Sequence, residues 1–147
     1  MLLGSDSLLN EIAALVGASS LGLGNASVAL ITAPFVMTPG QFNFNGLTEA
    51  NFDGYARQAA AFAGTPFIDE NGIYTIQGGA KVFQPSDTIT SNTVYGYVLT
   101  GSSSSTVMGG EVFNAPIPLT GPTTALTIIP RFGVPVTGAL GFAVVAD

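Results

Sequence analysis

The chain has 147 residues, contains no cysteine, histidine or tryptophan, and only 8% of its residues are charged. Without cysteine it forms neither disulfides nor thiolate metal sites, and its length suits one domain with its own core. Three basic residues against nine acidic ones give a net charge of −6. Such a chain cannot neutralise a run of phosphates, so we expect neither nucleic acid nor an anionic membrane as a partner.

The low charge also bears on the surface, because an average soluble protein has roughly 25% charged residues. A neutral surface of this kind is expected if much of it is buried in an assembly, and we therefore predict a homo-oligomer, either a dimer or a trimer. The alternative is a neutral, polar surface on a monomer. No apolar run reaches the ~20 residues that a membrane-spanning helix needs.

Residues 1–25 are predicted to form a helical arm followed by a Gly-rich joint. Ser7 to Val16 has the periodicity of a short helix, with Leu8, Ile12 and Leu15 on one face. This apolar stripe fits either an arm that docks on a neighbouring subunit or a helix packed on its own domain. No basic residue precedes Arg57, so we expect no signal peptide and no use of the secretory route.

Residues 26–147 are predicted to form one all-β domain, an antiparallel sandwich or barrel. Turn signals separate short strand-like runs every ~8–12 residues, which is typical of these folds, and we expect a jelly roll. One helical turn is expected over 47–52, capped by Thr48. The expected strands are Ala26–Ala33, Tyr55–Ala63, Ile73–Gln77, Lys81–Gln84, Val94–Thr100, Thr106–Phe113, Ala115–Leu119, Ala125–Phe132 and Leu140–Val145.

The residues that usually carry catalysis are scarce. Without histidine or cysteine the common nucleophilic triads and dyads cannot form, and Lys81 is the sole lysine that could activate a serine. The stretch Asp69–Gly72 lacks the ligand spacing of a calcium loop and reads as a hairpin turn, since Asn-Gly favours primed turns. We therefore expect no enzyme, no metal and no cofactor.

Two arginines invite a structural or an interface role. Arg57 lies four residues after Asp53, close enough for a local pair, and Arg131 follows an apolar run. In so apolar a chain we expect both arginines to be paired with acids or with backbone carbonyls, because an unpaired buried charge is costly. Contact with a partner subunit is the alternative, since arginine is enriched at interface hot spots.

The hairpin over residues 94–113 carries apolar side chains on both faces. Tyr95 and Tyr97 point to one side, and Val94 and Val98 point to the other with a gap at Gly96 between them. A soluble hairpin usually keeps one face in water. The second face must therefore be covered by another layer of the chain, by another subunit or by the N-terminal segment.

Several of these runs resemble a group of small tailed-bacteriophage virion proteins encoded near the major capsid protein. The resemblance covers residues 48–132, and the N-terminal arm is not part of it. The group is similar in architecture to jelly-roll cement proteins on the outside of capsids. The matching motifs are FDGYARQ (52–58), PFIDENG (66–72), VFQPSDT (82–88), NTVYGYVL (92–99), GGEVFNAPIPL (109–119) and ALTIIPRF (125–132).

The resemblance implies a non-enzymatic capsid cement or decoration protein on the exterior of the virion, assembled in the host cytoplasm, with the major capsid protein as its partner. The residues that we expect in contacts or in the core are Leu8, Ile12, Leu15, Tyr95, Tyr97, Met108, Phe113, Arg131 and Phe132. The alternative is a head- or tail-fibre adhesin that stacks host glycan on its tyrosines. A carboxylate-pair glycosidase is a third hypothesis.

Overall fold

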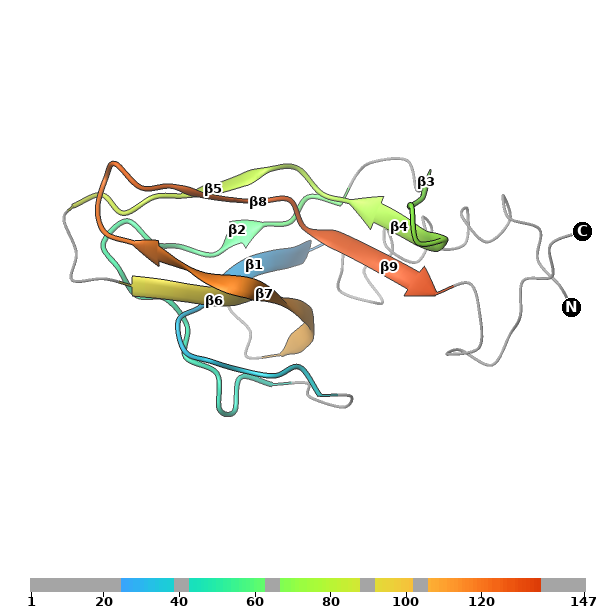
Figure 1. Ribbon diagram of the computed structural model, residues 1–147, viewed down its shortest axis with the longest axis horizontal. Coiled ribbons are helices and arrows are strands. Elements are labelled where there is room, and N and C mark those ends of the chain that lie inside the picture. The colour runs from blue at the N-terminus through green and yellow to red at the C-terminus, as the bar shows by residue number, and fades with distance from the viewer. Residues whose placement is uncertain (1–24, 39–42, 63–66, 88–91, 102–105, 136–147) are drawn as a thin grey trace, which may run out of the picture. The chain divides into compact units, whose positions relative to one another are not determined.

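The computed structural model describes residues 25–38, 43–62, 67–87, 92–101 and 106–135 (Figure 1). All regular structure in these ranges is β-strand in antiparallel sheets, which confirms the all-β prediction. No α-helix occurs in them, and hence none that is long and apolar enough to cross a membrane. The predicted helix over residues 7–16 and the predicted strand over 140–145 lie outside the described residues.

The described residues belong to two compact units within the range for which one domain was predicted. The larger unit, residues 25–60 and 80–128, holds a four-stranded sheet of order β2-β1-β6-β7 and the pair β5-β8. The smaller unit holds the sheet β3-β4-β9. The strands of the larger unit are β1 (Ala26–Ile31), β2 (Gln58–Ala59), β5 (Lys81–Phe83), β6 (Asn92–Gly101), β7 (Val107–Leu119) and β8 (Leu126–Ile128). Those of the smaller unit are β3 (Phe67–Ile68), β4 (Ile73–Gln77) and β9 (Arg131–Pro135).

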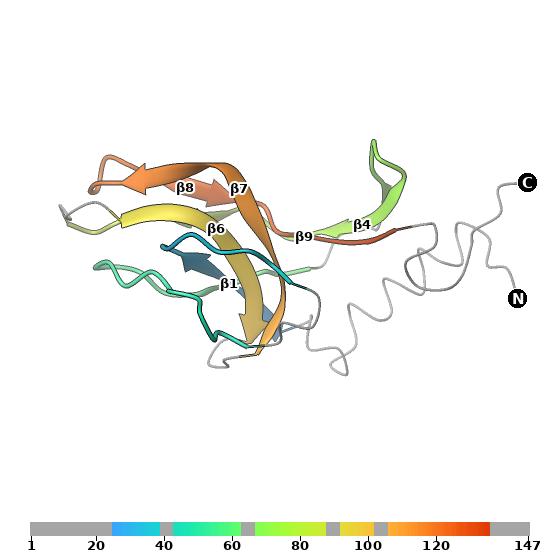
Figure 2. The ribbon, with the colours of Figure 1, turned by 60° about the horizontal axis from the view of Figure 1, so that its bottom comes forward.

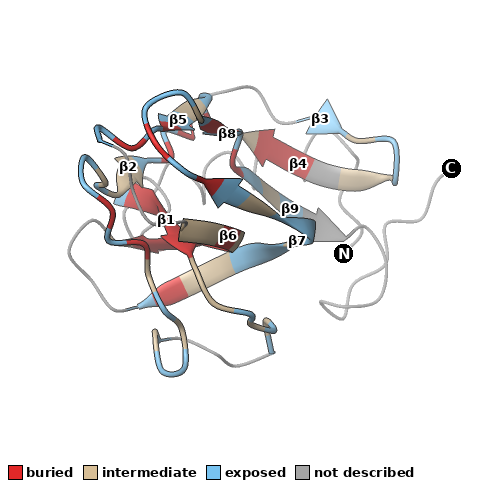
Figure 3. Cartoon of the chain, turned by 60° about the vertical axis from the view of Figure 1, so that its left-hand side comes forward, coloured by how far each residue is buried: buried red, intermediate tan, exposed pale blue. Residues whose placement is uncertain are grey.

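Strand β1 is the centre of the larger unit. Its sequence, ASVALI, alternates between two faces, yet all six residues are buried, as Figure 3 shows. A strand buried on both faces needs a layer on each side. One layer is the β5-β8 pair, which lies on one side of the sheet in Figures 1 and 3. Residues 33–38 and 43–47, which we call the covering segment, lie on the other side.

The covering segment packs on the second apolar face of the hairpin. Phe35, Met37, Phe44 and Leu47 pack against a cluster of buried side chains from β1, β6 and β7. That cluster consists of Ala29, Ile31, Val98 and Val107. The second apolar face is thus covered by a layer of the chain itself. The ring of Phe35 also explains why residue 96 has no side chain, because a Cβ at Gly96 would lie 2.8 Å from that ring.

Strand β7 is long but irregular, and it forms the edge of the sheet. Its register against β6 shifts twice, between Val94 and Gly96 and between Leu99 and Thr100. Such bulges bend a strand and increase its twist, and Figure 2 shows β6 and β7 bending together. The predicted strand Ala115–Leu119 is the last part of β7, and its two prolines lie at the sheet edge as expected.

Three other expectations differ from the structure. Residues 47–52 form no helical turn, because Glu49 pairs with Ile31 and the Ala50 N–H donates to Leu30 O at the edge of β1. The run 125–132 is not one strand, since Pro130 separates β8 from β9. The run 55–63 keeps only the two residues of β2 as strand among those described.

The turn after β3 is confirmed as a hairpin turn, but it is not a primed one. Gly72 has a φ of 74° and its N–H donates to Asp69 O, whereas Asn71 has no positive φ. The Asp69 carboxylate accepts from the N–H groups of Asn71 and Ile73. Residues 69–72, the last of them a left-handed glycine, therefore join β3 and β4.

Candidate functional site

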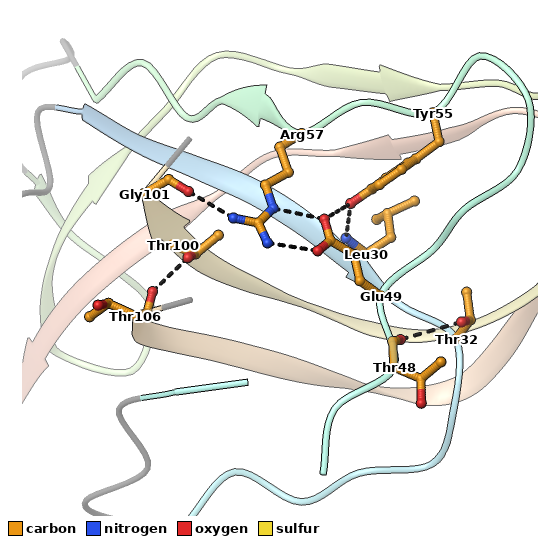
Figure 4. Close-up of polar contacts among 9 residues, drawn as sticks. All are labelled: Leu30, Thr32, Thr48, Glu49, Tyr55, Arg57, Thr100, Gly101 and Thr106. Atoms are coloured by element: carbon orange, nitrogen blue, oxygen red, sulfur yellow. Dashed lines mark hydrogen bonds and ion pairs between the residues drawn. The ribbon is translucent and has the colours of Figure 1, made fainter. Parts of the chain in front are cut away.

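The densest polar contacts in the described chain join Glu49, Tyr55 and Arg57, which we call the clamp (Figure 4). Arg57 binds both carboxylate oxygens of Glu49, with Nε–Oε1 at 2.8 Å and Nη2–Oε2 at 2.7 Å. The Tyr55 hydroxyl donates to the same Oε1 at 2.7 Å. This fork of two parallel bonds is the strong, directional form of an arginine–carboxylate pair.

The clamp forms where the chain leaves the edge of β1. Glu49 pairs with Ile31 at one end of β1, and β2 pairs with Ser27 and Val28 toward the other. Between these two contacts the chain loops away, so the N–H of Leu30 has no strand opposite it. The Tyr55 hydroxyl accepts from that N–H at 3.2 Å and so satisfies a buried backbone donor.

Arg57 extends the clamp across the sheet. Its Nη1 donates to Gly101 O at 3.0 Å, at the end of β6, and its guanidinium carbon lies 4.9 Å from the centroid of the Phe44 ring. Arg57 therefore links Glu49 at the edge of β1, the end of β6 and Phe44 of the covering segment. The prediction that Arg57 pairs with an acid or a backbone carbonyl is confirmed. The acid that forms its fork is Glu49, while Asp53 accepts from Ser86 Oγ.

The electrostatics of the clamp follow from its partial burial. Burial by itself would raise the pKa of Glu49, but the hydrogen bonds from Arg57 and Tyr55 outweigh it and lower the pKa below its usual value of 4.5. Burial and the bond to Glu49 raise the pKa of Tyr55. The bond to Glu49 raises the pKa of Arg57. All three groups therefore keep their ordinary charge states near neutral pH.

The hydrogen bonds of the clamp indicate a structural role. A general base needs an accessible lone pair and a matched pKa, whereas both Glu49 oxygens are held by donors on this chain. No group of three or more Asp or Glu side chains that could hold a metal ion occurs in the described ranges. The bonded groups of the clamp fix the fold of the larger unit.

The predicted contact residues of the hairpin separate into core and surface. Tyr97 is buried, with 4% of its surface exposed, and its hydroxyl donates to Glu111 Oε2 at 3.1 Å. Its ring lies 6.3 Å from that of Phe113, so these two predicted residues do come together. Tyr95, Met108 and Phe113 are half-buried.

The other predicted contact residues lie elsewhere. Arg131, which is exposed, and Phe132, which is half-buried, belong to β9 of the smaller unit. Leu8, Ile12 and Leu15 lie outside the described residues.

The sequence prediction missed the exposed apolar side chains. Val36, at 74% exposure, is the most exposed of them. Val112 is 44% exposed and pairs with Gly96, the residue over which the Phe35 ring lies. Directly paired residues share one face, so Val112 lies on the face of the sheet that Phe35 covers, and Val36 follows Phe35 in the chain. We call the two exposed side chains, Val36 and Val112, the valine patch. The sequence signal for the exposure of Val36 was PFVM (34–37), in which Phe35 and Met37 pack on the sheet and Val36 between them does not.

Four more large apolar side chains are exposed in the described chain. They are Phe67, Ile68, Val82 and Ile129.

Comparison of the chain with protein-family models, with curated proteins and with solved structures found no match.

Proposed function

We propose that this chain is a structural protein of a tailed-bacteriophage virion, a cement or decoration protein that binds the lattice of the major capsid protein on the outside of the head. The observation that carries the proposal is the combination of exposed apolar side chains with a nearly uncharged surface. Val36 and Val112 are exposed, and only 8% of the residues in the chain are charged. Apolar patches of this kind mark contact surfaces.

The rest of the larger unit supports a role in binding. The described polar groups of the clamp are engaged in bonds within the chain, and both faces of β1 are covered by the chain itself. A rigid β-core with weak contacts repeated by symmetry is what a cement protein needs. The finer architecture belongs to the same proposal: a jelly-roll sandwich, an N-terminal helical arm and a dimer or trimer.

The adhesin alternative receives less support. Two of its four tyrosines are already used within the chain: the ring of Tyr55 packs against Phe52 and Phe83, and Tyr97 is buried. A glycan platform needs exposed rings. The capsid proposal does not require these side chains to be free.

The first test counts this chain against the major capsid protein in purified virions by quantitative mass spectrometry. A ratio within a small factor of one supports a lattice protein. A handful of copies per particle would overturn the cement proposal in favour of a fibre or vertex protein, and absence from the particle would reject both.

The second test locates the contact. Val36→Asp and Val112→Asp place a charge in the valine patch, and Thr127→Asp places one at an exposed position of β8 as the matched control. Burying a valine contributes about 1.5–3 kcal/mol, so each patch variant should bind capsids lacking this protein at least roughly tenfold more weakly. Equal binding by all three folded variants would exclude the patch as the contact.

A further inference from the structure

Two of the eight asparagines in the chain are followed by glycine, Asn45–Gly46 and Asn71–Gly72. An Asn-Gly pair can modify itself. The glycine backbone nitrogen attacks Cγ of the asparagine side chain, the bond from Cγ to the amide nitrogen breaks, and ammonia leaves. Water then opens the resulting succinimide ring at either carbonyl, which gives aspartate or isoaspartate. No oxidant or reductant is needed, and glycine favours the reaction because it has no Cβ and a permissive backbone.

The two pairs lie in different turns. Asn45 and Gly46 are both exposed, Gly46 has a φ of 78°, and a Cβ on Gly46 would meet nothing within 4 Å. The turn is closed by the bond from Leu47 N–H to Phe44 O at 2.9 Å. No acceptor for the Gly46 N–H occurs in the described part of the chain.

The second turn restrains the attacking nitrogen, because the Gly72 N–H donates to Asp69 O at 3.0 Å. The N–H groups of the two asparagines are held alike, Asn71 by Asp69 Oδ1 at 2.8 Å and Asn45 by Asn43 Oδ1 at 3.0 Å. The attacking nitrogen of Gly72 must leave its hydrogen bond before it can reach Cγ of Asn71. Gly72 is also half-buried, whereas Gly46 is exposed.

We propose that Asn45 is a site of spontaneous deamidation in the folded protein and that it is modified faster than Asn71. The expected ratio is roughly fivefold, the factor that corresponds to about 1 kcal/mol for one hydrogen bond. This inference is independent of the proposed capsid function.

Deamidation of Asn45 would change the charge and the backbone of the covering segment. Phe44 and Leu47, which flank the pair, pack on the sheet, and Phe44 also contacts Arg57 of the clamp. Each converted asparagine changes the net charge of −6 by one further negative charge. Isoaspartate also adds a carbon to the main chain between Phe44 and Leu47. The isoaspartate form therefore loosens the cover, whereas the aspartate form changes only the charge.

The test incubates the full-length protein in mildly alkaline, isotopically labelled water and follows both sites by peptide mapping. In the folded protein we expect Asn45 to incorporate the label roughly fivefold faster than Asn71. In denaturant the two rates should converge. Equal rates in the folded protein, a faster Asn71, or an unmodified Asn45 would each overturn the proposal.

Two variants separate the turn geometry from the local sequence. Asp69→Ala removes the side-chain bonds to Asn71 and Ile73 but keeps the backbone bond from the Gly72 N–H to Asp69 O. Because that backbone bond holds the attacking nitrogen, Asn71 should remain slower than Asn45 in this variant, and the Asn45 rate should be unchanged. Asn45→Gln should abolish labelling at position 45 and should prevent the loss of thermal stability on prolonged incubation. A rise of the Asn71 rate in Asp69→Ala to that of Asn45 would contradict protection of Asn71 by the bond from the Gly72 N–H to Asp69 O.

Discussion

Strands β1 and β7 both pair with β6, but they differ in length, in burial and in the regularity of their register. β1 has six residues, all buried, and keeps an unbroken register with β6 from Ala26 to Ile31. β7 has thirteen residues, is largely exposed, and shifts register twice. The difference teaches that burial fixes the register of β1, because a slip of one residue would exchange its faces. The edge strand tolerates bulges and remains available for contacts.

The largest expected effect tests the burial of β1. Leu30→Ala removes a fully buried side chain and should lower the free energy of unfolding by about 2–5 kcal/mol. Val112→Ala on β7 removes a side chain that is 44% exposed and should change it by less than about 0.5 kcal/mol. Urea unfolding of both variants measures the contrast, and similar losses would remove the distinction between the two strands.

The next prediction concerns the close approach at the hairpin. A Cβ on Gly96 would clash with Glu111 O and would lie 2.8 Å from the Phe35 ring. Gly96→Ala should therefore destabilise the protein by about 1–3 kcal/mol, the usual cost of overpacking. Gly109→Ala on β7 is the control, because a Cβ there meets nothing within 4 Å. If both variants unfold at the wild-type urea concentration, Phe35 does not occupy the gap.

The clamp should cost less to break because it is partly exposed. Arg57→Met leaves Glu49 without its fork and Gly101 O without its donor, and we expect a loss of about 1–3 kcal/mol once solvent screening is allowed for. Arg131→Met, at an exposed position of β9, should be nearly neutral. Chemical denaturation of the two variants compares them directly, and equal stability would show that the clamp does not hold the edge of β1.

The smallest effect is a dependence on pH. The pKa of Glu49 is lower in the folded chain than its usual value of 4.5, so its stabilising contribution is present above pH 4.5 and is lost as the pH falls through the folded value. The stability difference between the wild type and Glu49→Gln should therefore shrink below pH 4.5. Denaturation series at several acidic pH values would measure it, and a constant difference would contradict the assignment.

Most strands could be predicted from the sequence because their signals are local. Turn signals next to strand-like runs identified β4 and the hairpin of β6 and β7, and the prolines of β7 indicated an edge. The all-β class followed from the same patterns. The helical turn over 47–52 was wrong because Thr48 offered a plausible cap, whereas pairing of Glu49 with β1 decided the conformation. Tertiary pairing overrides a weak local preference.

The clamp and the valine patch could not be predicted in the same way. Asp53 lies closer in sequence to Arg57, but the fork forms with Glu49. Glu49 pairs with Ile31 at the edge of β1, and the chain loops away from that edge and returns to it near Arg57. The exposure of Val36 depends on which residues of the covering segment face the sheet. Both features depend on how these segments pack against the edge and the face of the sheet, which one sequence does not reveal.

The pairing of Ala26 with Gly101 has a consequence for the order of folding. β1 is made first, but β6 pairs with it only after residue 101 has been made, and β2 also follows β1 in the chain. The hairpin of β6 and β7 is local and can close early, whereas non-local pairing is slow. An apolar strand that waits for its partners is exposed to intermolecular pairing. The scarcity of charge that suits the finished surface thus leaves the nascent chain with few charged side chains to keep it apart from its neighbours.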